Sequence, residues 1–171
     1  MEQERDSLGV VIQNEALFKA VYELILPEDT MCVGNIFKVP FTKIYQCFDF
    51  YKDDNILEAV ALITGKSIED FLKESANEAI KFMKWLEQEI DQCSKLLNSI
   101  PSVNDPDMAA AGADRMNDIG EFAIYRSITN DPRKWKSLGE VEFELMYVKL
   151  LGDGIQSVIQ RDYNEIIKNK K

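Results

Sequence analysis

The chain has 171 residues, 46% hydrophobic and 29% charged, which predicts one globular domain with a substantial core. Lys and Arg number 20 against 30 Asp and Glu, and the net charge of −10 argues against binding along a nucleic-acid backbone. The sequence has no His, which excludes His-based triads and His-ligated zinc sites, and its three Cys are widely spaced. No apolar run is as long as a membrane span and the first residues are charged, so we expect neither membrane attachment nor a signal peptide.

The N-terminal quarter begins with a polar segment and continues into an ambiguous apolar one. Residues 1–7 are expected to form an N-terminal arm. Leu8–Ile12 contains three β-branched residues and is compatible with a strand, followed by a helix that Asn14 caps. A single helix from Ser7 to Leu26 is the alternative, and Pro27 ends either version.

A β-hairpin is predicted over about residues 30–39. Gly34-Asn35 lies between two short apolar runs, and Gly at the first turn position favours a two-residue hairpin loop. An isolated hairpin is marginally stable in water, so it must pack on helices or pair with a neighbour. The hairpin is either a small structural ribbon or an edge that contacts another subunit. In the second interpretation the partner interface includes Ile36, Phe37 and Val39.

Two helices follow the hairpin. Phe41 to Tyr51 has aromatic and aliphatic residues at helical spacing, which indicates core packing because no basic residues interleave with the aromatic ones. Asp53 or Asp54 is expected to cap a second helix over Ile56–Thr64, and Gly65 is well placed to end it. The Gly65-Lys66-Ser67 triplet resembles the end of a phosphate-binding loop, but the remaining glycines of that loop are missing, so we predict no nucleotide site.

One long helix over about residues 67–98 is the most prominent predicted element. Its apolar residues recur at alternating steps of four and three, which is typical of a heptad seam. Ser67 and Asp70 stand where a capping box would start the helix. The seam comprises Leu72, Ala76, Ala79, Met83, Leu86, Ile90, Cys93 and Leu97. The predicted fold is therefore mainly α, a helical bundle around this helix with a small hairpin, in a single domain over residues 1–171.

The C-terminal part begins with a Pro- and Ser-rich linker near residues 99–106. Asp105-Pro106 and Asp131-Pro132 are each predicted to start a helical segment. Ser137 and Glu140 form a capping box for the last helical region, and Gly152-Asp153-Gly154 is expected to break or kink it. Apolar residues lie on one face before these glycines and resume after them, namely Val141, Leu145, Val148, Leu151, Ile155, Val158, Ile159, Ile166 and Ile167.

Paired carboxylates are the remaining candidates for chemistry. They occur at Asp53/Asp54, Glu69/Asp70 and Glu140/Glu142, and the first two pairs lie at predicted helix starts, where negative charge is favourable. No nucleophile stands beside a recognisable base. We therefore predict no catalytic residues, no metal site and no cofactor, and we expect a protein that is not an enzyme.

Two segments resemble small proteins of tailed bacteriophages. Residues 54–71, DNILEAVALITGKSIEDF, combine a short helix, an Ile-Thr-Gly turn and a capped acidic helix. Residues 111–122, AGADRMNDIGEF, are similar to a Gly-x-Asp-Arg pattern of head–tail connector and tail-assembly proteins in phages of the crAss-like type. The resemblance implies a virion structural protein, a connector or tail ring subunit that contacts its own copies and neighbouring portal or tail proteins.

Two other functions stay open at this point. One is a tail-assembly chaperone that is absent from the mature virion, and the other is an acidic regulatory or inhibitor protein. The expected location is the virion, assembled in the host cytoplasm, with no membrane partner and no sequence-specific nucleic-acid binding. The sequence leaves the ring stoichiometry and the neighbouring proteins undetermined.

Overall fold

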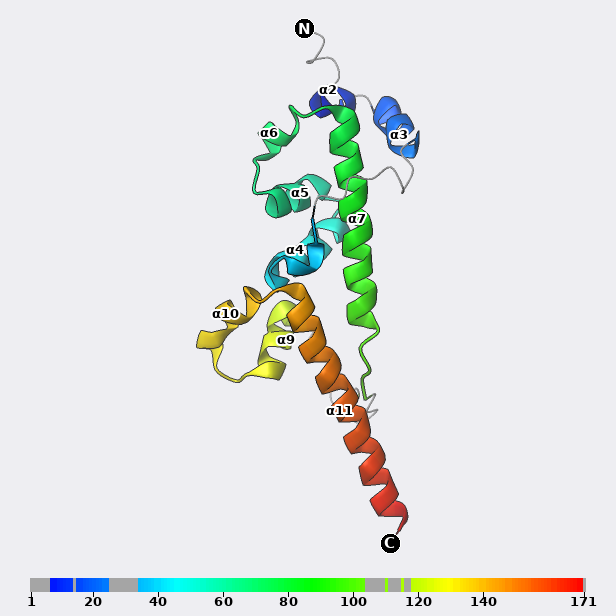
Figure 1. Ribbon diagram of the computed structural model, residues 1–171, viewed down its shortest axis with the longest axis vertical. Helices are drawn as coiled ribbons and strands as arrows, with labels where there is room; N and C mark the ends of the chain where they lie inside the picture. Colours follow the sequence, from blue (N-terminus) through cyan, green and yellow to red (C-terminus); the bar gives the residue numbers. More distant parts are fainter. Residues whose placement is uncertain are drawn as a thin grey trace. The chain divides into compact units, whose positions relative to one another are not determined.

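The computed structural model describes residues 7–13, 15–24, 34–103, 110, 115 and 118–170, and helices dominate them (Figure 1). The chain is divided into two compact units, the first made of residues Met1–Ile36 and Gln46–Cys93 and the second of Phe37–Tyr45 and Ser94–Lys171. Within the described part of the chain no strand forms, and only two isolated β-bridges occur. The prediction of a mainly α fold is confirmed.

The first two helices are α2 (Leu8–Ile12) and α3 (Glu15–Leu24). The strand interpretation of Leu8–Ile12 is therefore wrong, and so is the single helix from Ser7, because a turn at Gln13 separates the two helices. The start of α2 is fixed by backbone hydrogen bonds from Leu8 N and Gly9 N to carbonyl oxygens of the segment that precedes α7, each 2.9 Å long.

The predicted helix over 67–98 is instead two helices, α6 (Ile68–Phe71) and α7 (Ala76–Asn98). Ser67 does cap α6, since its hydroxyl oxygen accepts a hydrogen bond of 3.1 Å from Asp70 N. The helix ends after one turn because the carbonyl oxygens of Leu72 and Glu74 accept the hydrogen bonds from α2. The sequence does carry a signal for a second start, because residues 75–78 read Ser-Ala-Asn-Glu, which is the pattern of a capping box.

The predicted seam is confirmed as core from Ala76 to Cys93, whereas Leu72 lies before α7 and both Leu72 and Leu97 are only half-buried. Leu86 and Cys93 are 0% exposed, and the apolar residues of this helix are buried at steps of three and four. Phe82 packs edge-on against Phe71 of α6, with ring centroids 6.1 Å apart. The buried residues of α7 are Ala76, Ala79, Ile80, Phe82, Met83, Trp85, Leu86, Ile90 and Cys93.

The two helices predicted between residues 41 and 65 are present as α4 (Phe41–Lys52) and α5 (Ile56–Thr64). Gly65 ends α5 in the left-handed conformation, with φ of 70°, as its position predicted. Neither Asp53 nor Asp54 caps α5, because both lie in the preceding turn and Asn55 occupies the N-cap position without a side-chain bond.

The predicted β-hairpin is not supported. Residues 30–33 lie outside the described residues, and Ile36–Lys38 forms a 3₁₀ helix, η2. The backbone beyond η2 bonds to the segment before α11 instead of folding back on itself. Phe41 N donates to Val141 O at 2.8 Å, and Phe143 N donates to Val39 O at 2.9 Å.

The second unit contains α9 (Glu121–Ile128), η4 (Pro132–Lys134), α10 (Trp135–Gly139) and α11 (Phe143–Asn169). The start predicted at Asp131-Pro132 is confirmed, since the Asp131 carboxylate accepts a hydrogen bond of 3.2 Å from Arg133 N. The capping box predicted at Ser137 is wrong, because Ser137 lies inside α10 and its hydroxyl donates to Lys134 O. The start predicted at Asp105-Pro106 lies outside the described residues.

α11 continues without a break through Gly152-Asp153-Gly154, so the predicted interruption is wrong (Figure 1). Gly154 serves close packing, because a Cβ there would lie 2.4 Å from the carbonyl oxygen of Pro101. With 27 residues, α11 is longer than α7, which has 23.

Candidate interaction surface

The N-terminal turn of α11 is anchored by aromatic and ionic contacts. The Phe143 ring stacks on Phe41 at the start of α4, with centroids 6.1 Å apart and planes inclined by 13°. The Lys38 ammonium lies 3.0 Å from carboxylate oxygens of both Glu142 and Glu144. These contacts hold the first turn of α11 against the start of α4, so the orientation of the helix within its unit is well defined.

A hydrogen-bonded group joins α4 and α9 in the same unit. The Thr42 hydroxyl and the Tyr125 hydroxyl each donate to Glu121 Oε2 at 2.9 Å. Burial raises the pKa of Tyr125, and the hydrogen bond that its hydroxyl donates to the Glu121 carboxylate raises it further. The group satisfies the polar atoms of a buried tyrosine, so we assign it a structural role.

One face of α11 packs within the second unit. Phe143 is 0% and Met146 2% exposed, and both lie on this face. Gly154 continues it, where the chain at Pro101 approaches. Toward the C terminus this packing ends, and every described residue from 159 to 170 is exposed.

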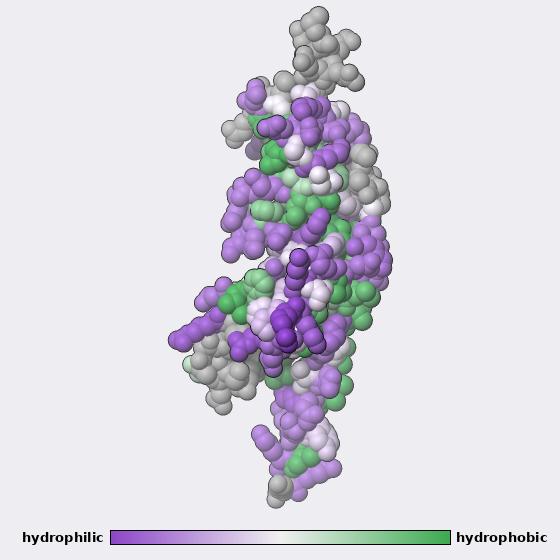
Figure 2. Space-filling model, turned by 90° about the vertical axis from the view of Figure 1, so that its left-hand side faces the viewer, coloured by the Kyte–Doolittle hydropathy of each residue, from purple (hydrophilic) through white to green (hydrophobic). Residues whose placement is uncertain are grey.

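The opposite face of α11 carries a row of exposed apolar side chains, named here the α11 strip. Its members are spaced three or four residues apart, except at one place where two members are seven residues apart. Gly152 lies between those two and in line with the strip. At about 100° per residue, the strip is on the far side of the helix from Phe143 and Gly154. Green atoms among purple ones mark apolar residues on the C-terminal part of α11 at the bottom of Figure 2. The strip consists of Leu145, Val148, Ile155, Ile159, Tyr163 and Ile166, exposed by 46 to 62%.

Charged residues border the strip on both sides. A heptad assignment that places Leu145 and Ile159 at a positions describes these borders. Glu144 and Glu165 are then at g positions on one border, and Lys149 and Lys170 are at e positions on the other. Lys149 also forms an ion pair with Asp153 of its own helix. An apolar centre with a charged rim is the composition of a protein–protein contact surface.

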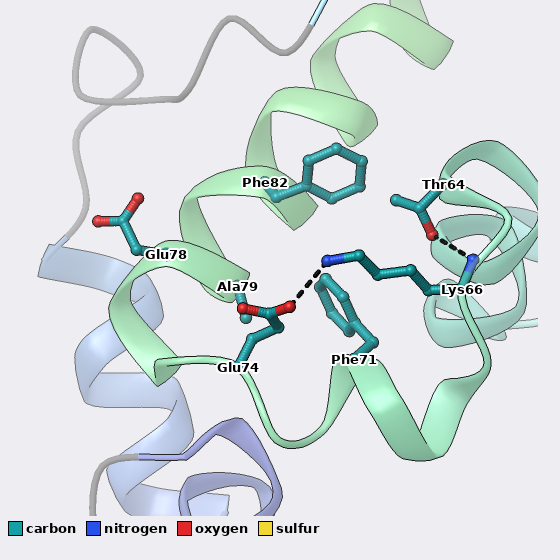
Figure 3. A pocket seen from close by; sticks show the side chains of 7 residues that line it. All are labelled: Thr64, Lys66, Phe71, Glu74, Glu78, Ala79 and Phe82. Atoms are coloured by element: carbon teal, nitrogen blue, oxygen red, sulfur yellow. Dashed lines mark hydrogen bonds and ion pairs between the residues drawn. The ribbon is translucent and has the colours of Figure 1, made fainter. Parts of the chain in front are cut away.

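A hollow of about 330 Å³ lies in the first unit, between α5, α6 and α7 (Figure 3). The Lys66 side chain extends toward Glu74, and its ammonium is 2.7 Å from that carboxylate. The Thr64 hydroxyl oxygen accepts a hydrogen bond of 3.2 Å from Lys66 N. Because these polar groups bond to one another, the hollow offers mainly the apolar surface of Phe71 and Phe82 and the small side chain of Ala79.

Several buried or partly buried titratable groups lie near α7. Tyr22 donates a hydrogen bond to Glu87, and the Lys84 ammonium lies 4.5 Å from the centre of the Tyr22 ring. Burial raises the pKa values of Tyr22 and Tyr51, and it raises the pKa of Cys93 to about 12. Tyr22, Tyr51 and Cys93 therefore keep their protons at neutral pH, so none of these three side chains is prepared to act as a nucleophile or base.

The structure places the predicted interface residues near the start of α4. Ile36 is 1% exposed, so it has almost no surface to offer a partner, whereas Phe37 and Val39 are partly exposed. Phe37 contacts Phe143, with ring centroids 6.0 Å apart. An interface at this segment stays a prediction. The strip on α11 was present in the sequence as an apolar face, but the expected helix break at the glycines hid its continuity.

The comparisons add no known relative, since the chain matched no family model, no curated protein and no solved structure. Within the described ranges, no group of three or more Cys, Asp or Glu side chains could hold a metal ion. No described helix combines the length and the apolar character needed to cross a membrane. The resemblance to phage proteins therefore stays a hypothesis.

Proposed function

We propose that this protein is a non-enzymatic structural subunit of an assembly with several copies, and that the α11 strip is its principal contact surface. The observation that carries the proposal is the row of large apolar side chains exposed by 46 to 62% on one continuous helix. Burying apolar surface of this kind is favourable, and contiguous exposed patches commonly mark protein–protein contacts.

The setting we propose is the head–tail or tail region of a tailed-phage virion. The resemblance of residues 54–71 and 111–122 to connector and tail-assembly proteins supports this setting. The partners would be other copies arranged in a ring and neighbouring portal or tail proteins. The net charge of −10 favours protein contacts over contacts with packaged nucleic acid.

A tail-assembly chaperone is the second candidate, because an exposed apolar strip on a strongly acidic chain would also suit temporary cover of a hydrophobic tail protein. The two functions differ in where the chain is found after assembly. A ring subunit stays in the finished particle, whereas a chaperone leaves it.

Quantitative mass spectrometry of purified particles tests the proposal. A ring subunit gives a fixed copy number per particle, in a constant ratio to the portal protein. Ile159→Asp places a charge in the α11 strip and should lower that copy number. Asn164→Asp adds the same charge outside the strip and should leave the copy number unchanged. Absence of the chain from particles, together with its recovery on an unassembled tail protein, would contradict the ring subunit and favour the chaperone.

A further inference from the structure

We infer that the α11 strip binds the same strip of a second copy of this chain, with the two helices parallel. The inference rests on the proposed function, because it names the partner of the surface assigned there. It requires that the strip fit a copy of itself and that the bordering charges select one orientation. Both requirements can be tested on the isolated chain, without assembled particles.

The spacing of the strip suits a coiled-coil contact. Leu145, Gly152, Ile159 and Ile166 recur every seven residues, and Val148 and Ile155 occupy the second core position of the same heptads. The segment covers about three heptads, or roughly 30 Å of helix at 1.5 Å per residue. Asp162 occupies a core position too, and in a parallel pair its carboxylate would face that of the other copy, which weakens the contact in that layer. Its carboxylate is 2.8 Å from Arg161 of the same helix.

The charges at the border distinguish the two orientations. In a parallel pair, a residue on the g side of one helix faces the e-side residue five positions further along its partner. Glu144 then faces Lys149 of the other copy, and Glu165 faces Lys170, so both contacts are attractive.

In the fully overlapped antiparallel pair, like borders meet. In the register that brings Glu144 opposite Glu165, the two equivalent contacts between these carboxylates would be repulsive, whereas Lys149 would lie opposite Gln156. The cis ion pairs of Glu144 with Lys38 and of Lys149 with Asp153 leave the sign of this difference unchanged, because the side chains concerned are half exposed and can bridge two partners. The border charges therefore favour the parallel orientation.

The parallel orientation is also compatible with the proposed ring. Parallel helices around a common axis are related by cyclic symmetry, which closes on itself. The β-branched residues at both core positions, Val148, Ile155 and Ile159, favour more than two strands over a simple pair.

Disulfide trapping of the full-length chain tests the orientation. Leu145→Cys and Ile166→Cys are made separately in a Cys32→Ser background, where the remaining Cys47 and Cys93 are 0% exposed. Parallel helices place each new thiol beside its own counterpart, so each variant alone should form a covalent dimer under mild oxidation. Asn164→Cys, exposed on the same helix but outside the strip, is the control and should react much more slowly. Adding Ile159→Asp should abolish the fast reaction, with helix content by circular dichroism unchanged.

Two results would overturn the inference. Fast cross-linking only in a mixture of Leu145→Cys and Ile166→Cys would show an antiparallel contact. Rates no higher than that of the Asn164→Cys control would show that copies do not meet at the strip. Mass spectrometry of purified particles does not depend on these cross-linking results. A chain that is found in particles but does not cross-link at the strip therefore refutes this inference alone. A chain that cross-links in parallel but is absent from particles refutes the proposed virion role alone.

Discussion

α7 and α11 are the two longest described helices, and each carries apolar residues at steps of three and four. In α7 those residues form the core of the first unit, with Leu86 0% exposed. In α11 one apolar face is buried in the second unit while the opposite face stays exposed, with Ile159 at 62%. The comparison teaches that an apolar period predicts a buried face but not the chain that buries it.

The largest expected difference comes from the same truncation in the two helices. Leu86→Ala should lower the free energy of unfolding by about 2–5 kcal/mol, because it leaves a cavity in the core. Leu145→Ala should change it by no more than about 0.5 kcal/mol at low protein concentration, since Leu145 is 58% exposed. Urea unfolding of both variants measures the difference, and equal losses would mean that the α11 strip is core as well.

The two glycines of α11 allow the same comparison within one helix. Gly154→Ala should destabilise the protein by about 1–3 kcal/mol, since the new Cβ would lie 2.4 Å from Pro101 O and the backbone must shift. Gly152→Ala should stabilise it by about 0.5–1 kcal/mol, because Gly152 lies on the exposed face with no described atom outside its helix within 4 Å of such a Cβ. Thermal melts of the pair are sufficient, and a stabilised Gly154→Ala variant would disprove the close approach at Pro101.

Alkaline pH tests the buried surroundings of α7 together with those of Tyr125 in the second unit. Tyr51 lies in the first unit, and burial raises its pKa above the ordinary value of 10.0. Between that value and the raised one, the unfolded chain loses a proton that the folded chain keeps. The stabilising contribution is therefore complete below about pH 10 and is lost as the pH rises further. Urea unfolding at pH 8 and above pH 10 should show this fall.

Tyr51→Phe provides the control for the alkaline measurement. The Tyr51 hydroxyl is buried and has no hydrogen-bond partner among the described residues. Its removal should raise the free energy of unfolding by about 1 kcal/mol at pH 8 and weaken the fall above pH 10. A destabilised variant would show that the hydroxyl has a bonding partner.

Local signals predicted much of the fold because they depend on neighbours in sequence. The start of α6 at Ser67, the end of α5 at Gly65 and the start of η4 at Asp131 were each set by the chemistry of one or two side chains. Helical spacing likewise placed α4 and the core face of α7 correctly.

The errors occurred where distant segments decide the outcome. The break before α7 depends on hydrogen bonds from Leu8 and Gly9, and the missing hairpin depends on bonds between residues 39–41 and 141–143. α11 runs on through both glycines, and Gly154 leaves room for the chain near Pro101, a distant segment that local spacing does not reveal. The exposed strip could not be identified from the sequence, because its apolar period is the same as that of a buried face.

Amide hydrogen exchange, followed by mass spectrometry at a low and a high protein concentration, tests the central comparison most directly. We expect peptides from α7 to exchange slowly at both concentrations, because their packing partners lie in the same chain. Peptides covering residues 155–169 of α11 should exchange quickly at low concentration and become protected at high concentration, as copies associate. Protection of that segment at both concentrations, or rapid exchange at both, would contradict the assignment of the α11 strip to a contact between copies.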